Sequence, residues 1–242
     1  MKTEIYVATH KAYTFPDIPE YIPIHVGKAL TDLDLNIQGD NTGENISHLN
    51  KSFCELTALY WMWKNSDADI IGLAHYRRYL GSIGTLNGKF DSIISVSEIE
   101  KKSLKKPGFI ILAKKEKIID YKFFNFSVKH QYRRCHYLSD WNVLKNVISR
   151  KYPEYMDAFE SLEISKEMSY YNMFISNRSF VNKYCSWLFD ILFQVEKEVD
   201  ISDYDDYQKR VFGFMAERLL NVFVKKHEKE LDILYFDTIR IE

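Results

Sequence analysis

Residues 70–79, with the sequence IIGLAHYRRY, join an apolar segment to a cluster of side chains that can bind an anion. The apolar half comes first, and His75, Arg77 and Arg78 follow it directly. Arginine offers a planar fork of donors that matches a phosphate, and it stays charged at every relevant pH. Three potential cations so close together predict an anion-binding site. The alternative is that each arginine forms an ion pair with a nearby carboxylate.

The apolar half of this run predicts a strand that is buried on both faces, as in a parallel α/β sheet. Ligands of such sheets bind beyond the carboxyl ends of the strands. Side chains alternate along a strand, so we expect His75 and Arg77 on one face and Tyr76 and Arg78 on the other.

The elements around this strand alternate between strand and helix patterns. Strands are predicted over 3–9, 108–113, 172–175 and 233–236, and helices over 47–65, 139–150, 179–198 and 207–226. This order predicts an α/β fold with a mostly parallel sheet flanked by helices. The length suits a single domain over 1–242, within which residues 80–137 form a variable, aromatic and basic excursion.

The overall charge argues against one broad class of partner. Lys and Arg total 33, Asp and Glu total 34, and the net charge is −1. A chain without a global positive charge is not drawn to nucleic acid, so any anion binding must be local. We therefore expect no nucleic-acid partner.

The sequence predicts a cytoplasmic location. Its start, MKTE, leads directly into a strand pattern, which predicts no signal peptide. No run of eighteen apolar residues occurs, so we expect no membrane span. Cys54, Cys135 and Cys185 show no pairing or metal spacing and fit incidental thiols in a reducing compartment.

Most familiar catalytic motifs are absent from the sequence. It contains no GxGxxG, no GxxxxGK followed by Ser or Thr, no HExxH, no GxSxG and no CxxC. The triplet Asp67-Ala68-Asp69 spells DxD, a pattern that binds divalent metals where it follows a strand. Here the triplet precedes the strand, so we interpret it as a helix-to-strand turn.

The last predicted helix carries a second set of polar groups. Arg210, Gly213 and Glu217 lie at offsets of three and seven residues and so share one side of the helix. A glycine inside a helix costs about 1 kcal/mol relative to alanine, which predicts that Gly213 permits the close approach of another group. The alternative for Glu217 and Arg218 is an ordinary solvated pair.

Residues 121–137 interleave aromatic and basic side chains. Such segments stack on bases or sugars, or lie at a membrane interface. The alternative is a segment that packs over the sheet. The positions concerned are Tyr121, Phe123, Phe124, Phe126, His130, Tyr132, Arg133, Arg134, His136 and Tyr137.

Several segments together resemble one known family. They are ATHK at 8–11, GDNTGENIS at 39–47, ELTALYWMWKN at 55–65, GLAHYRRY at 72–79, NMFI at 172–175, YCSWLF at 184–189 and RVFGFMAERL at 210–219. Through them the chain is similar, along nearly its whole length, to the bacterial domain of unknown function family 4422. Residues 80–106 match nothing in that pattern.

The resemblance implies a glycosyltransferase of bacterial capsular polysaccharide, exopolysaccharide or O-antigen synthesis. It implies a GT-A-like fold, a UDP-sugar donor and transfer of a hexose such as galactofuranose. The acceptor would be a saccharide or a lipid-linked saccharide at the inner face of the cell membrane, with the enzyme peripheral to that membrane. The resemblance does not fix the sugar, the linkage or the stereochemical outcome.

The resemblance and the residue chemistry together give the expected donor site. A departing nucleoside diphosphate needs a metal or fixed cations, and we expect His75, Arg77 and Arg78 to supply this charge. No metal ligand is assigned, and Mn²⁺ or Mg²⁺ stays open as a cofactor. Donor contacts are expected from Thr9, His10, Lys11, Asp40, Asn41, Asn45, His75, Tyr76, Arg77 and Arg78.

Transfer also needs a carboxylate to remove the proton of the acceptor hydroxyl. The candidates are Glu217, Asp140, Asp205 and Asp206. Glu217 is preferred because Arg210 and Gly213 lie on its side of the helix. Acceptor contacts are expected from Tyr132, His136, Tyr137, Asn172 and Arg210.

Two rival functions stay open from the sequence. A non-catalytic carbohydrate-binding or scaffold protein of the same assembly would bind sugar without binding nucleotide. A nucleic-acid-binding module built on residues 121–137 is disfavoured by the net charge.

Overall fold

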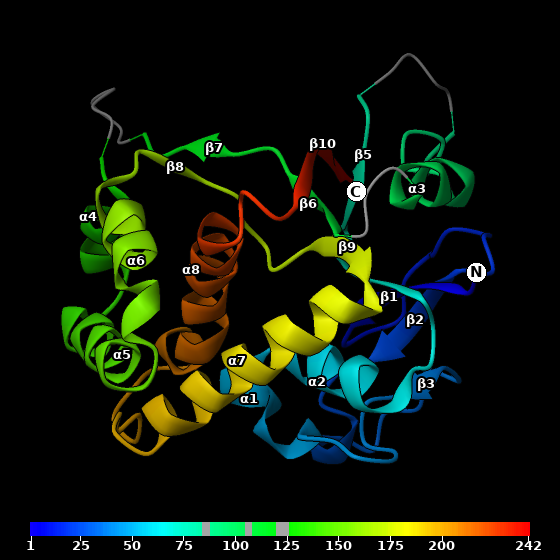
Figure 1. The fold of residues 1–242 in the computed structure, drawn as a ribbon. Helices are drawn as coiled ribbons and strands as arrows, with labels where there is room; N and C mark the ends of the chain where they lie inside the picture. The colour runs from blue at the N-terminus through cyan, green and yellow to red at the C-terminus, as the bar shows by residue number, and fades with distance from the viewer. Residues whose placement is uncertain (84–87, 105–107, 120–125) are drawn as a thin grey trace.

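A computed structural model describes residues 1–83, 88–104, 108–119 and 126–242 of the chain (Figure 1). Within these ranges an eight-stranded sheet has the order β3-β2-β1-β4-β5-β10-β6-β9, and a small second sheet pairs β7 with β8. The strands are β1 (Thr3–Thr9), β2 (Tyr21–His25), β3 (Gln38–Gly39), β4 (Ile70–His75), β5 (Arg78–Gly81), β6 (Phe109–Ala113), β7 (Glu116–Lys117), β8 (Glu167–Met168), β9 (Phe174–Asn177) and β10 (Asp232–Arg240).

The helices gather mainly on one side of the large sheet. In Figure 1, α4 to α8 lie together beside the strands, whereas α3 lies apart near β5. The helices are α1 (Asn50–Phe53), α2 (Leu56–Asn65), α3 (Val96–Ser103), α4 (Val128–Cys135), α5 (Leu138–Lys151), α6 (Met156–Ile164), α7 (Arg178–Glu196) and α8 (Val211–Lys226). In the described ranges, no helix combines the length and the apolar content needed to cross a bilayer.

The large sheet is mixed rather than mostly parallel, which corrects the sequence prediction. β1 pairs in parallel with β2 and β4, and β6 pairs in parallel with β10. β5 runs antiparallel to both its neighbours, and β9 runs antiparallel to β4 and β6. The reason at β5 is local, because only two residues separate it from β4, and such a short connection must reverse the chain. The predicted α/β class holds.

Both faces of the sheet are buried, as the apolar run in β4 predicts. Ile71 and Leu73 face a core built with helices α2, α5, α7 and α8. Ile70 and Ala74 alternate with them and face a second core, which includes Ile99 of α3. His75 follows Leu73 in the alternation, so its side chain emerges on the face that the main helical layer covers.

The predicted helix over 47–65 is interrupted at Cys54. This residue has φ 53° and ψ −130°, a left-handed φ that no helix contains, and it separates α1 from α2. The helix α8 passes close by, since a Cβ on Gly213 would lie 3.3 Å from the Cys54 Sγ atom. The prediction that Gly213 permits a close approach is therefore confirmed. Because of this break, Glu55 lies at the N-cap of α2 and not inside a continuous helix.

Residues 80–137 do not form one excursion from the domain. Within this stretch the strand β6 is fully buried at the centre of the fold, and α3 covers one face of the sheet. The helix α4 belongs to the main helical layer. The aromatic residues Tyr121, Phe123 and Phe124 lie outside the described residues.

Candidate active site

A cleft of about 790 Å³ opens where β1 and β4 end. Its walls come from the ends of these two strands, Val26 after β2, the junction between α1 and α2, the loop before β9, and the segment that leads into α8 together with its first turns. Because β1 and β4 are parallel, their carboxyl ends meet at this edge. This is the position at which open α/β sheets bind their ligands.

The cluster after β4 forms a tight β-hairpin turn at the edge of the cleft. His75 pairs directly with Arg78 of β5, and Tyr76 and Arg77 form the two-residue turn between them. Side chains of directly paired residues share one face of a sheet. His75 and Arg78 are therefore on the same face, which corrects the predicted grouping. The strand ends at His75, so simple alternation does not continue beyond it.

The buried ring of Tyr76 contacts two cations and is not freely exposed to a ligand. Its side chain is buried, with its ring centroid 5.0 Å from that of Tyr13 and 5.5 Å from that of His10. The Lys11 Nζ atom lies 5.4 Å from the Tyr76 ring centroid, and the Arg77 Cζ atom lies 5.1 Å from it. A ring face stabilises nearby cations, so Tyr76 holds positive charge beside the end of β1.

The cleft carries positive charge that carboxylates do not neutralise. Three acidic side chains also line it, but none of the cations forms an ion pair with a carboxylate of the described residues. For Arg77 and Arg78 this excludes the structural ion pairs considered from the sequence, within the described part of the chain. The cations are Lys51, Arg77, Arg78, Lys209 and Arg210, and the acidic residues are Glu55, Asp206 and Glu217.

Glu217 forms a nearly buried pair with its neighbour rather than a solvated one. Its Oε2 atom lies 2.8 Å from the Arg218 Nη1 atom, and the Arg218 side chain is only 2 % exposed. Its Oε1 atom accepts a hydrogen bond of 3.0 Å from the backbone N–H of Tyr171. Burial raises the pKa of Glu217, and the charge of Arg218 opposes this shift. Both oxygens therefore have partners in the described structure.

Glu55 is a cleft carboxylate that the sequence analysis missed as a site residue. Its Oε1 atom accepts a hydrogen bond of 2.7 Å from the Asn172 Nδ2 atom. That amide is 2 % exposed and also donates to the backbone oxygen of Gly213. Asn172 was expected to contact the acceptor, but it lies behind Glu55 and orients it.

The loop before β9 places two successive residues in the left-handed region. Tyr171 has φ 76° and Asn172 has φ 52°, a conformation that costs energy for residues other than glycine. The backbone oxygen of Tyr171 lies 2.7 Å from the His75 Nε2 atom. A carbonyl oxygen only accepts hydrogen bonds, so Nε2 carries a proton.

His75 contributes a neutral imidazole rather than a third cation. Burial is the main cause that lowers its pKa, and the charges of Arg78 and Arg210 act in the same direction. Glu55 and the Tyr171 carbonyl oppose the shift but do not reverse it. A histidine whose pKa is below its usual value is uncharged at pH 7. The fixed positive charge of the cluster therefore comes from Arg77 and Arg78.

Comparison with known proteins identifies the family. The family described as domain of unknown function DUF4422 matches residues 4–229. The chain belongs to this family. The DUF4422 match thus includes the ends of β1 and β4, Glu55 and the start of α8, and it stops before β10 begins.

A solved structure has the same fold as this DUF4422 chain. It is the bifunctional glycosyltransferase WbbM in an apo structure, with 30 % sequence identity and a TM-score of 0.90. The match covers 100 % of this chain and 46 % of WbbM, so the chain spans less than half the length of that protein. No curated protein matches the sequence.

Several expected donor residues of the DUF4422 pattern do line the cleft. Thr9 and His10 at the end of β1 do so, together with the hairpin-turn residues His75, Tyr76, Arg77 and Arg78. Lys11 lies beside them against Tyr76. Burial lowers the pKa of His10, and the charges of Lys11 and Arg77 add to this effect.

The segment 39–47 does not reach the cleft, which corrects three expected donor contacts. Asp40 is fully buried, and its carboxylate accepts hydrogen bonds from the backbone N–H groups of Gly27 (2.8 Å) and Lys28 (3.1 Å). Asn45 hydrogen-bonds within its own turn, and Asn41 is exposed away from the cleft. Asp40 stabilises this loop, because its oxygens accept hydrogen bonds from backbone N–H groups.

Most of the expected acceptor residues also lie outside the cleft. Tyr132 is fully buried in the helical core, and Tyr137 packs against Tyr204. His136 stacks on Phe214 behind the cleft wall, with ring centroids 4.2 Å apart, and burial lowers its pKa to about 4. Arg210 does line the cleft. Tyr132 of α4 thus packs in the helical layer, whereas Arg133 and Arg134 of the same helix are exposed.

Two of the candidate bases are likewise placed elsewhere. Asp140 is 3 % exposed and accepts a hydrogen bond of 2.8 Å from the Tyr204 hydroxyl. Asp205 is exposed, and its Oδ1 atom accepts a hydrogen bond of 2.7 Å from the backbone N–H of Gln208. Asp206 and Glu217 line the cleft.

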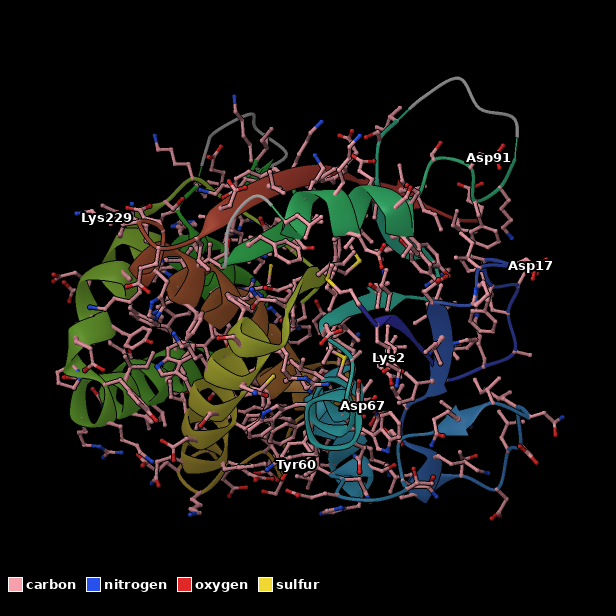
Figure 2. The ribbon with its side chains drawn as sticks, turned by 45° about the vertical axis from the view of Figure 1, so that its right-hand side comes forward. Lys2, Asp17, Tyr60, Asp67, Asp91 and Lys229 are labelled. Atoms are coloured by element: carbon pink, nitrogen blue, oxygen red, sulfur yellow. The ribbon has the colours of Figure 1, made fainter. Side chains whose placement is uncertain are left out.

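The DxD-like triplet lies away from the cleft. Asp67 and Asp69 precede β4 and so lie at its opposite end, where Asp67 pairs with Lys2 (Figure 2). This confirms the helix-to-strand turn. In the cleft, Glu217 is already occupied on both oxygens. Across the described ranges, no three His, Cys, Asp or Glu side chains form a group that could hold a metal ion.

Proposed function

We propose that this chain is a glycosyltransferase domain that moves a hexose from a UDP-sugar to a saccharide or lipid-linked saccharide acceptor. The unneutralised cation cluster at the carboxyl ends of β1 and β4 carries this proposal. Membership of the DUF4422 family and the similarity to a bifunctional glycosyltransferase support it. The cleft volume of about 790 Å³ is large enough for a nucleotide sugar.

The donor diphosphate would lie against the hairpin turn and the start of α8. Arg77 and Arg210 contribute guanidinium groups from two walls of the cleft, and Lys209 adds an ammonium group. Negative charge develops on the departing diphosphate during transfer, and fixed cations that face it lower the barrier. The nucleotide would extend toward Thr9 and His10 in a GT-A-like arrangement.

Glu55 is the proposed base, in place of Glu217. Among the described residues, the Glu55 Oε2 atom has no hydrogen-bond partner, whereas both oxygens of Glu217 are engaged. The Glu55 carboxylate would take the proton of the acceptor hydroxyl, and the acceptor oxygen would then bond to the anomeric carbon. The bond from that carbon to the diphosphate breaks, and UDP leaves with the electron pair. Glu217 acts as a positioning residue through Tyr171.

The cellular setting comes from the family resemblance. We propose synthesis of a bacterial surface polysaccharide, such as a capsule, an exopolysaccharide or an O-antigen, with galactofuranose as one candidate sugar. The enzyme would act in the cytoplasm at the inner face of the cell membrane, where a lipid-linked acceptor is presented. Fixed cations would make transfer less dependent on a divalent metal than in DxD transferases.

A thermal-shift screen against UDP-sugars, with and without Mn²⁺ or Mg²⁺, tests the proposal. We expect a rise in Tm with UDP and with at least one UDP-sugar in both conditions. Slow release of UDP from the stabilising donor, by hydrolysis or transfer, would show turnover. Stabilisation by free sugars without any response to UDP would instead support a carbohydrate-binding or scaffold protein and overturn the proposal.

A further inference from the structure

Three polar residues form a row across β4, β5 and β10. Arg78 pairs directly with His75 on one side and with Arg240 on the other. Directly paired residues in antiparallel strands carry their side chains on the same face, so all three project from the helix-facing side. Arg240 lies beyond the family match, which ends at residue 229.

Tyr171 lies over this row and contacts each of its members. Its backbone oxygen lies 2.7 Å from the His75 Nε2 atom, and the centre of the Arg78 guanidinium lies 4.6 Å from the Tyr171 ring centroid. The Arg240 Nη2 atom donates a hydrogen bond of 3.1 Å to the Tyr171 hydroxyl. The two guanidinium groups are thus gathered around one phenol ring.

The positive charges of Arg78 and Arg240 contact the Tyr171 phenol but no carboxylate of the described residues. Like charges directly opposite each other on neighbouring strands are destabilising. No carboxylate of the described residues forms an ion pair with either arginine. The Arg78 Nε atom is buried and has no hydrogen-bond partner in the described structure. A buried donor without a partner carries a free-energy cost that a bound anion would remove.

Adjacent arginines of the hairpin diverge toward different neighbours. Arg77 contacts Tyr76, which packs against His10 at the end of β1. Arg78 contacts Tyr171 and faces β10. Positive charge is therefore presented on two sides of the turn, and a single diphosphate beside β1 leaves the side toward β10 unfilled.

We propose that Arg78, Arg240 and the Tyr171 hydroxyl form a second anion subsite, which binds a phosphate group carried by the acceptor. This inference rests on the proposed function, because it assigns the β1 side of the turn to the donor. A guanidinium pair with a phenol donor suits the oxygens of a phosphate monoester or diphosphate. An acceptor held there would place its saccharide beside the donor cleft.

Calorimetric titration of inorganic pyrophosphate into the UDP-saturated protein tests the subsite. Pyrophosphate should bind the wild-type complex without displacing UDP. Arg240→Gln should weaken that binding about 10- to 100-fold, as expected for the loss of a charge-assisted hydrogen bond, and should leave the UDP affinity within twofold. Arg150→Gln is the matched control, since this exposed arginine on α5 pairs with Glu198 and should change neither affinity.

A second variant tests the subsite independently, in case Arg240→Gln does not fold. Tyr171→Phe removes only the hydroxyl that Arg240 contacts, and it should also weaken pyrophosphate binding while the UDP affinity stays the same. The subsite is overturned if pyrophosphate merely competes with UDP, or if Arg240→Gln weakens both ligands equally. Binding of phosphatidylglycerol vesicles that depends on Arg240, without any pyrophosphate binding, would assign the cluster to a membrane surface and overturn the acceptor role. Failure of UDP to bind the wild-type protein would overturn the proposed function itself, together with the acceptor role.

Discussion

At one end of the β1–β4 strand pair the charged side chains form ion pairs, and at the other end they do not. At the amino end, Lys2 forms ion pairs with Glu4 (2.9 Å) and Asp67, and its backbone N–H donates to Asp69 (Figure 2). At the carboxyl end, the cations of the cleft have no carboxylate partners among the described residues. One sheet edge therefore satisfies its charges internally, and the other leaves them for a ligand.

Charge pairing distinguishes the DxD-like triplet from the end of the sheet to which we assign function. Asp67 and Asp69 have the residue types of a metal site but lie at the paired end, away from the cleft. Arg77 and Arg78 lie at the unpaired end, where the strands open into it. Proteins break local rules of charge pairing mainly at functional sites, so the unpaired end is the one to which we assign chemistry.

Removal of the two donor-side arginines of the cleft is the strongest test of this contrast. Arg77→Ala combined with Arg210→Ala should weaken UDP binding about 10²- to 10⁴-fold, because two charge-assisted hydrogen bonds of about 1.5–3 kcal/mol each are lost. Calorimetry measures the affinity, and Tm should not fall, since no ion pair of the described residues is broken. Lys2→Ala, at the other end, should leave the UDP affinity unchanged. Equal affinities in the double variant and the wild type would remove the cation role.

Neutralising the proposed base should affect turnover rather than binding. Glu55→Gln keeps an oxygen that can accept from Asn172 but cannot take a proton, so kcat should fall about 10²- to 10⁴-fold while donor affinity changes little. Asp206→Asn is the matched control in the same cleft. If Asp206→Asn causes the larger loss of kcat, the base is Asp206 and not Glu55.

The titration of His10 reports the charge state of the cleft directly. Burial lowers its pKa, and Lys11 and Arg77 lower it further, so His10 is neutral at pH 7. A bound diphosphate would offset the neighbouring cations and raise this pKa, which an NMR titration with and without UDP measures. His227, which lies outside the cleft lining, serves as the reference. An unchanged His10 pKa in the UDP complex would place the anion elsewhere.

The smallest effect is expected at the paired end. Asp67→Asn removes an ion pair between exposed side chains, and such pairs contribute little to stability. Tm, UDP affinity and any response to Mn²⁺ should all match those of the wild type. A loss of metal-stimulated turnover in this variant would show that the triplet takes part in catalysis.

The strands and the cation cluster could be predicted from the sequence because both are local patterns. Apolar runs locate β1, β4 and β6, and the polar residues directly after β1 and β4 do line the cleft. Strand direction could not be predicted in the same way. The antiparallel course of β9 depends on pairing with β4 and β6, which lie far from it in sequence.

The errors at the site come from burial and backbone geometry. Asp40 and Tyr132 have suitable chemistry but are fully buried, and residue type alone does not reveal this. The place of Glu55 in the cleft could not be predicted, because the helical pattern continues through Cys54, whose left-handed φ breaks the helix. A positive φ at a non-glycine residue cannot be recognised from a single sequence. Arg240 enters the site only through its pairing with Arg78.

Calorimetric titration of UDP into the wild-type protein in excess EDTA tests the central claim most directly. Fixed cations at the carboxyl ends of β1 and β4 need no metal to hold a diphosphate, so we predict saturable binding with the same affinity with and without the chelator. Loss of binding in EDTA and its recovery on addition of Mn²⁺ would contradict this account.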